Sequence, residues 1–120
     1  MGYYTNYSLT IEKGDDAVIQ EFTGECEGAE HAIFPDGESN NSTKWYSHQT
    51  DLMEFSKKHP DTVFCLYGEG EEAGDLWNLY VKNGKGQRCK AKIDYPLFDE
   101  KELSVDHGIN SPEYYYRSSW

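Results

Sequence analysis

Polar and hydrophobic residues alternate most clearly between Asp75 and Tyr95. Every second position is apolar in two stretches of that segment, first at Trp77, Leu79 and Val81 and then at Cys89, Ala91 and Ile93. A period of two predicts strands with one buried face, so we expect this segment to form a β-hairpin.

The turn of this hairpin decides which side chains share a face. A two-residue turn at Asn83-Gly84 would place Trp77 opposite Lys90 and would mix apolar with basic positions. We therefore predict a three-residue loop at residues 82–84, with Gly84 at positive φ, which pairs Trp77 with Cys89. The opposite face of the hairpin is then predicted to carry a basic strip of Lys82, Arg88, Lys90 and Lys92.

Shorter patterns predict the remaining elements. In order, they are a central strand at residues 3–11, a helix at 15–24, brief strands at 31–34 and 43–47, a helix at 51–59, a strand at 62–67 and the hairpin. Helical spacing predicts that Val18, Ile19, Phe22, Leu52 and Phe55 are buried. This order predicts a ferredoxin-like α+β fold, an antiparallel sheet with two helices on one face, extended by a C-terminal β-hairpin.

Length and cysteine content narrow the class of protein. The chain has 120 residues, and we expect residues 1–103 to form a single domain and residues 104–120 an aromatic tail. No apolar run approaches the ~20 residues that a membrane span needs, and the N-terminus has no signal-peptide pattern, so a cytoplasmic protein is expected. The three cysteines are widely separated, which argues against a disulfide framework. Cys65 and Cys89 are expected to be small buried residues.

The charge is strongly negative and unevenly distributed. A net charge of -11 disfavours direct binding to nucleic acid and favours partners with basic surfaces. Residues 14–43 contain no Lys or Arg but hold eight acids: Asp15, Asp16, Glu21, Glu25, Glu27, Glu30, Asp36 and Glu38. A second acidic group comprises Glu69, Glu71, Glu72 and Asp75. We expect both groups to bind a partner.

The tail ends in a run of aromatic residues that includes Tyr114, Tyr115 and Trp120. Tyr and Trp are enriched among the residues that dominate interface energies, so we expect these side chains to dock on another chain. Folding back onto the sheet is the alternative. The other chain can be a host protein or a second copy of this chain, so a homodimer is one of the outcomes compatible with the sequence.

Several short motifs resemble a group of small acidic proteins encoded by phages and prophages. The motifs are Met1 to Thr5, Lys44-Trp45-Tyr46, the predicted helix at 51–59, residues 68–72, residues 74–77 and residues 82–85. The resemblance covers residues 1–98 and implies no catalytic residues. It favours roles in host interaction or in resistance to host defence.

No enzyme motif is present: the four histidines lack the HExxH spacing, and GxSxG is absent. We expect no cofactor, because the acids at 69–75 lack the ligand pattern of a calcium loop.

We therefore expect a non-enzymatic anti-defence inhibitor that imitates DNA and binds a basic, nucleic-acid-handling host protein. One alternative is an immunity protein for a nuclease toxin. Another is a nucleotide-signal sponge that uses Tyr3, Tyr7, Tyr80, Arg88, Lys90 and Lys92.

Overall fold

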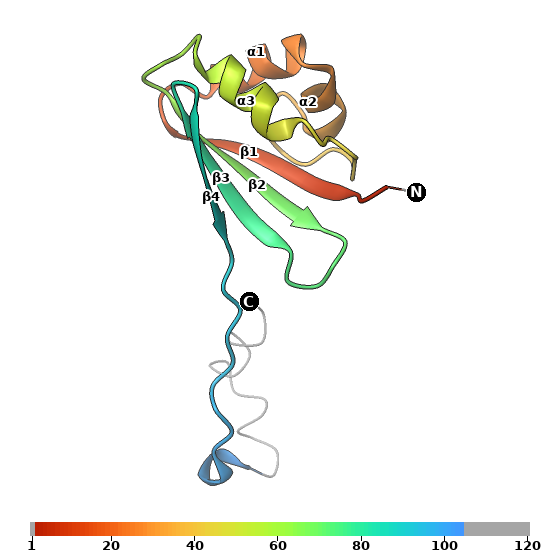
Figure 1. Ribbon diagram of the computed structural model, residues 1–120, viewed down its shortest axis with the longest axis vertical. Helices are drawn as coiled ribbons and strands as arrows, with labels where there is room; N and C mark the ends of the chain where they lie inside the picture. Colours follow the sequence, from red (N-terminus) through yellow and green to blue (C-terminus); the bar gives the residue numbers. More distant parts are fainter. Residues whose placement is uncertain (1, 105–120) are drawn as a thin grey trace.

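Four antiparallel strands form one sheet, and all three helices cover the same face of it (Figure 1). The computed structural model describes residues 2–104. The elements in order are β1 (Thr5–Lys13), α1 (Ala17–Glu25), α2 (Glu27–Ala32), α3 (His48–Ser56), β2 (Val63–Gly70), β3 (Leu76–Lys82), β4 (Lys85–Lys90) and the short 3-10 helix η1 (Glu100–Glu102). The strands lie in the order β1-β2-β3-β4.

This architecture agrees with the predicted α+β class, but the ferredoxin-like arrangement is not confirmed, because the strand order is sequential. Residues 31–34 and 43–47 contribute only single bridges, Ile33 to Ser39 and Thr5 to Thr43, instead of the predicted strands. Their apolar residues, including Ile33 and Trp45, are buried in the core without a strand ladder. The helices therefore follow β1 as one block, and β2, β3 and β4 follow as a meander.

The first strand lies at the edge of the sheet, although its pattern predicted a central strand. A loop covers part of its outer edge. Thr5 and Thr43 exchange two backbone hydrogen bonds of 3.0 Å, and the Leu9 amide donates to the Gly37 carbonyl at 2.9 Å. These bonds satisfy backbone groups that an open edge would expose, which explains how an apolar strand is tolerated there.

The core lies between the helices and the sheet. The helices contribute Val18, Ile19, Phe22, Leu52 and Phe55, as predicted, and the sheet contributes Tyr7, Leu9, Phe64, Leu66, Trp77, Leu79 and Val81. The helix α3 starts at His48 and ends at Ser56, three residues earlier at each end than the predicted range 51–59. Its last turn tightens, because the Lys57 amide donates to the Glu54 carbonyl, three residues back, ahead of Pro60.

The hairpin turn differs from the prediction. Asn83 and Gly84 have φ values of 46° and 78° and form a two-residue turn, so Trp77 lies opposite Lys90 instead of Cys89. Two positive φ values match the right-handed twist of the strands, and this local preference outweighs the mixing of apolar and basic faces. The predicted three-residue loop is therefore wrong.

The register moves several side chains to other faces. Arg88 and Lys90 share the helix side of the sheet with Trp77, whereas Lys82 lies on the open side, so the basic strip is not on one face. Cys89 also lies on the open side and is exposed, contrary to the prediction. Cys65 is buried, as predicted.

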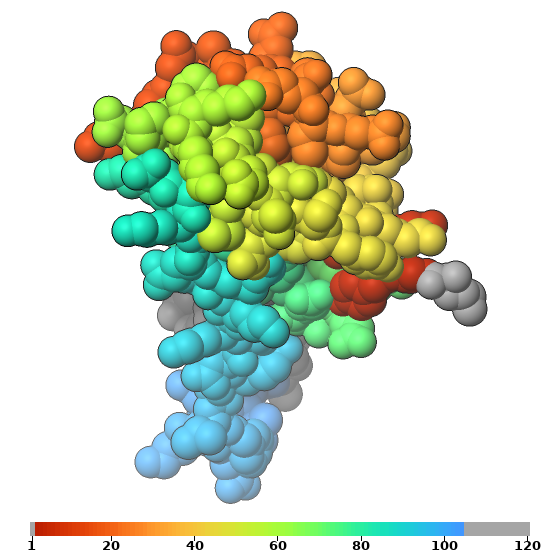
Figure 2. Space-filling view, turned by 45° about the horizontal axis from the view of Figure 1, so that its top comes forward, coloured from red at the N-terminus to blue at the C-terminus, as the bar shows by residue number. Residues whose placement is uncertain are grey.

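After β4, residues 91–104 leave the sheet and run away from the rest of the domain (Figure 1). The space-filling view shows the same segment projecting below the helices and the sheet (Figure 2). The predicted interface residues Tyr114, Tyr115 and Trp120 lie outside the described residues.

Candidate functional site

The eight acids of residues 14–43 form what we call the acidic surface, on α1, on α2 and on the loops that flank them. All eight are exposed: Asp15, Asp16, Glu21, Glu25, Glu27, Glu30, Asp36 and Glu38. Figure 2 shows these helices together with α3 as one continuous side of the molecule. The binding of a partner by these acids stays a prediction, with which their exposure is compatible.

Few basic groups neutralise the acidic surface. Glu25 pairs with Lys58 from the end of α3, and Glu21 Oε1 lies 3.1 Å from His59 Nε2. The hydrogen bond from Lys58 lowers the pKa of Glu25, which keeps that carboxylate ionised. Within residues 2–104 the other six acids of the surface form no ion pair. The surface therefore presents mostly uncompensated negative charge.

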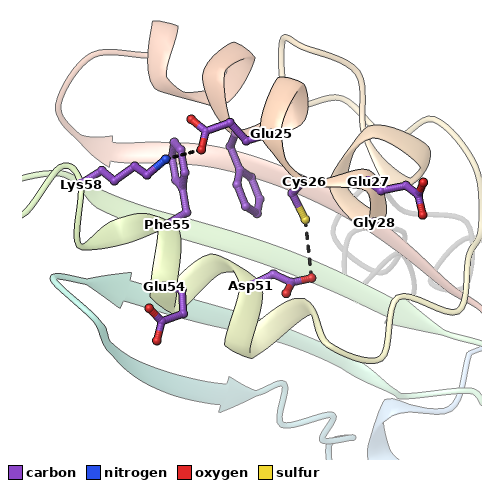
Figure 3. Close-up of a pocket in the computed structure, with 9 residues that line it drawn as sticks. Glu25, Cys26, Glu27, Gly28, Asp51, Glu54, Phe55 and Lys58 are labelled. Carbon is purple, nitrogen blue, oxygen red and sulfur yellow. Dashed lines mark hydrogen bonds and ion pairs between the residues drawn. The ribbon is translucent and has the colours of Figure 1, made fainter.

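A groove of about 540 Å³ separates the α1–α2 junction from α3 (Figure 3). It is lined by Phe22, Glu25, Cys26, Glu27, Gly28, Asp51, Glu54, Phe55 and Lys58. In Figure 3, Lys58 reaches toward Glu25, and Cys26 points toward Asp51. The Lys58 ammonium also lies 5.8 Å from the centroid of the Phe55 ring. The groove thus already holds one cation between a carboxylate and an aromatic ring.

Asp51 fixes the geometry at the other end of this groove. Its Oδ2 accepts hydrogen bonds from Trp45 Nε1 at 2.8 Å, from Ser47 Oγ at 2.8 Å and from Cys26 Sγ at 3.5 Å. Gly28 permits the close approach of Trp45, because a Cβ at that position would lie 2.4 Å from Trp45 Cδ1. The Asp51 carboxylate therefore holds α3 against the junction of α1 and α2.

Cys26 is the one thiol that borders this groove. Burial, and to a smaller extent the charge of Asp51, raise its pKa. A thiol in this environment stays protonated near neutral pH and is a poor nucleophile. The groove is therefore suited to binding and offers no activated cysteine.

A second cluster lies where α3 meets β3 and β4. His48 Nδ1 donates to the Trp45 carbonyl at 2.8 Å, while Arg88 Nη2 donates to His48 Nε2 at 2.8 Å. The His48 ring stacks on the Trp77 ring, with the two centroids 5.0 Å apart. The Arg88 guanidinium lies 4.1 Å from the centroid of the Trp77 ring. Burial, with a contribution from Arg88, lowers the pKa of His48, which agrees with a neutral imidazole. The cluster anchors α3 to the sheet.

The sequence reasoning missed Trp45, His48 and Asp51. They recur every third residue, which is a signal for one face of a helical turn. This signal is hidden because the local patterns predict a strand around Trp45 and a helix that begins only at residue 51.

The second acidic group lies at the connection between β2 and β3, and part of it has a structural role. Asp75 Oδ2 accepts a hydrogen bond of 2.6 Å from the Tyr3 hydroxyl, which accepts one of 3.1 Å from the Glu72 amide. The Tyr4 amide donates to Glu71. The bond to Asp75 raises the pKa of Tyr3. Glu72 takes part only through its backbone amide, so within the described residues the carboxylates of Glu69 and Glu72 make none of these contacts.

The residues predicted for a nucleotide sponge do not meet at one place. Tyr7 is buried in the core, and Tyr80 lies on the open face of the sheet near Asn78. Arg88 and Lys90 lie on the helix side, Lys92 follows the end of β4, and Tyr3 is bonded to Asp75. Of these residues, Tyr7 and Arg88 both contact His48, and the nucleotide-sponge role stays a prediction.

No group of three His, Cys, Asp or Glu side chains in the described part of the chain is arranged to hold a metal ion. In the same part, every helix is too short or too polar to cross a membrane. No family model, curated protein or solved structure matches the chain.

Proposed function

We propose that this protein is a non-enzymatic binding protein whose acidic surface docks on a basic partner. More specifically, we propose a phage-type anti-defence inhibitor that occupies the nucleic-acid-binding surface of a host protein. The observation that supports this proposal is the exposure of eight carboxylates, of which two have a basic partner among the described residues.

Electrostatics makes such a surface effective as a binding element. Ionised carboxylates on a helical scaffold present repeated negative charge, as a phosphate backbone does. Attraction between oppositely charged surfaces can raise association rates by roughly 10 to 10³-fold and falls as salt screens the charges. An inhibitor that competes with nucleic acid benefits from fast association of this kind.

The groove beside the acidic surface gives the partner a defined anchor point. Glu25 and Phe55 already hold the Lys58 ammonium there, so the local chemistry accepts a cation. A partner arginine that displaces Lys58 would contact the same carboxylate and ring, with Glu27 and Glu54 also lining the groove. Arg suits this position because its planar guanidinium both stacks and forms paired hydrogen bonds.

The test combines capture from a host lysate with charge-neutral variants. The protein is immobilised, basic proteins are captured at low salt and eluted at high salt, and the affinity of the identified partner is then measured. Glu27→Gln with Glu30→Gln removes two unpaired carboxylates of α2. Glu12→Gln with Asp61→Asn removes the same charge from exposed positions on β1 and on the loop that follows α3, outside both acidic groups, and serves as the control.

The expected result is a partner whose binding weakens with salt and weakens more in the α2 variant than in the control. Absence of any partner at low salt, or binding that is indifferent to ionic strength, would count against the proposal. The origin of the partner separates the two related roles. A host defence protein indicates an inhibitor, whereas a toxin nuclease indicates an immunity protein.

A further inference from the structure

The segment that follows β4, residues 91–103, is referred to as the C-terminal arm. Every residue in it is exposed. It nevertheless carries large apolar side chains with exposed fractions of 48% for Ile93, 80% for Tyr95, 93% for Leu97, 79% for Phe98 and 66% for Leu103. A run of this kind on one short segment is typical of a surface that contacts another chain.

The backbone of the arm also lacks partners. The Ala91 amide donates to the Leu76 carbonyl at 2.9 Å, which is the last contact with β3. Among the described residues, the amides of residues 92–95, 97 and 98 donate to no backbone carbonyl, Pro96 has no amide hydrogen, and β4 has no neighbouring strand on its outer side. The edge of β4 and the extended part of the arm thus form one unpaired strand edge, which is a template for strand addition.

Charge changes sign along this edge. The first part, residues 85–92, carries only bases, at Lys85, Arg88, Lys90 and Lys92, whereas residues 93–103 of the arm carry Asp94, Asp99, Glu100 and Glu102 with one base, Lys101. Two copies that run antiparallel would place the basic part of each against the acidic part of the other. An arrangement of that kind is closed by a two-fold axis.

We propose that a second copy of this chain occupies this edge, so that β4 and the C-terminal arm of two protomers pair antiparallel in a symmetric dimer. Ile93, Tyr95 and Leu97 are spaced by two and share one face of an extended strand, where they contact their counterparts. This surface is separate from the acidic surface. Failure of one proposal therefore leaves the other standing.

The bases on β4 make this pairing selective. Lysine on an edge strand protects a sheet from unwanted association, because identical strands in register bring like charges together. The same bases attract the acidic end of the arm of the second copy. The charge pattern therefore disfavours other registers and favours the antiparallel one.

The test uses two charge-reversed variants of the full chain, followed by sedimentation equilibrium at low salt over a concentration series. One carries Lys90→Glu and Lys92→Glu, and the other carries Glu100→Lys and Glu102→Lys; all four positions are exposed. The wild type is expected to be a dimer. Each variant alone is expected to have a dimer Kd at least about tenfold higher, because like charges then face each other. An equimolar mixture of the two is expected to form a heterodimer, since opposite charges are restored on both sides.

A control and three outcomes make the test decisive. Lys13→Glu with Lys44→Glu changes the net charge by the same amount as Lys90→Glu with Lys92→Glu, but near β1 at the opposite edge of the sheet, and is expected to leave the dimer intact. A monomeric wild type across the whole series would overturn the proposal. Dimers that persist in both arm variants, or a mixture that forms no heterodimer, would overturn it as well.

Discussion

The guanidinium of Arg88 lies 4.1 Å from the centroid of the Trp77 ring. This contact explains how a charged residue is accommodated on the helix side of the sheet, where the two-residue turn places it. The ring supplies a favourable surface for the cation, and His48 and Gln49 on α3 accept hydrogen bonds from the same nitrogen at 2.8 Å and 3.1 Å. Arg88 thus connects the edge strand to the helical layer.

Replacing Arg88 with alanine is expected to lower the free energy of unfolding by about 1–2 kcal/mol, because the cation–π contact and the bond to His48 are lost together. Arg88→Lys is expected to restore only part of this, since an ammonium cannot both stack and bond in the same way. Urea unfolding measures the difference. Lys82→Ala, at an exposed position on β3, is the control and should change stability by less than about 0.5 kcal/mol. Equal effects at the two positions would contradict the role assigned to Arg88.

The lowered pKa of His48 predicts a pH-dependent stability. Burial and Arg88 disfavour the charged imidazole in the folded state, so the unfolded chain binds the proton first as the pH falls below about 6.5. Stability is therefore expected to decrease between that pH and the lower pKa of the folded state. His48→Gln should flatten this part of a plot of melting temperature against pH. His31→Gln, at an exposed position, should leave the slope unchanged.

Two glycines provide a matched test of packing. A Cβ at Gly68 would lie 2.1 Å from Trp77 Cζ2, so Gly68→Ala forces the indole to move and is expected to cost about 1–3 kcal/mol. Gly24, inside α1, has open space around its Cα. Gly24→Ala is therefore expected to stabilise the protein by roughly 0.5–1 kcal/mol. Thermal unfolding of both variants checks the pair, and a neutral Gly68→Ala would show that Trp77 does not lie against β2.

The parts of this fold that were predictable from sequence are those set by local periodicity. Helical spacing identified Phe22 and Leu52 as core residues, because a helix with one apolar stripe can bury it in only one way. The hairpin turn was mispredicted because the alternation of apolar and polar positions was given more weight than the local preference of Asn83-Gly84 for a two-residue turn. The alternation argument assumed that no base would lie on the helix side, and the contact between Arg88 and Trp77 depends on a register that only the folded sheet defines.

The edge position of β1 was also beyond the sequence pattern, because the hydrogen bonds that cover it come from a loop. The exposure of the acidic surface was predictable, since charged side chains remain in water unless they are paired. The contacts of Asp51 were not predictable from the sequence. They join Trp45, Ser47 and Cys26, and the contact with Cys26 depends on how α3 lies against the α1–α2 junction.

Asp51 is expected to be the acid on α3 whose loss is most damaging. Asp51→Ala leaves the buried indole of Trp45 without its hydrogen-bond acceptor and removes the contacts of Ser47 and Cys26, which is expected to cost about 1–3 kcal/mol. Asp51→Asn retains an acceptor oxygen and should cost less. The control is Glu54→Ala, because Glu54 lies on the same helix, is exposed and pairs only with Lys57 among the described residues, so a change within about 0.5 kcal/mol is expected. Urea unfolding, monitored by tryptophan fluorescence, measures the free energy of unfolding of all three variants. If Asp51→Ala were no more destabilising than Glu54→Ala, the carboxylate could not be what holds α3 against the junction of α1 and α2.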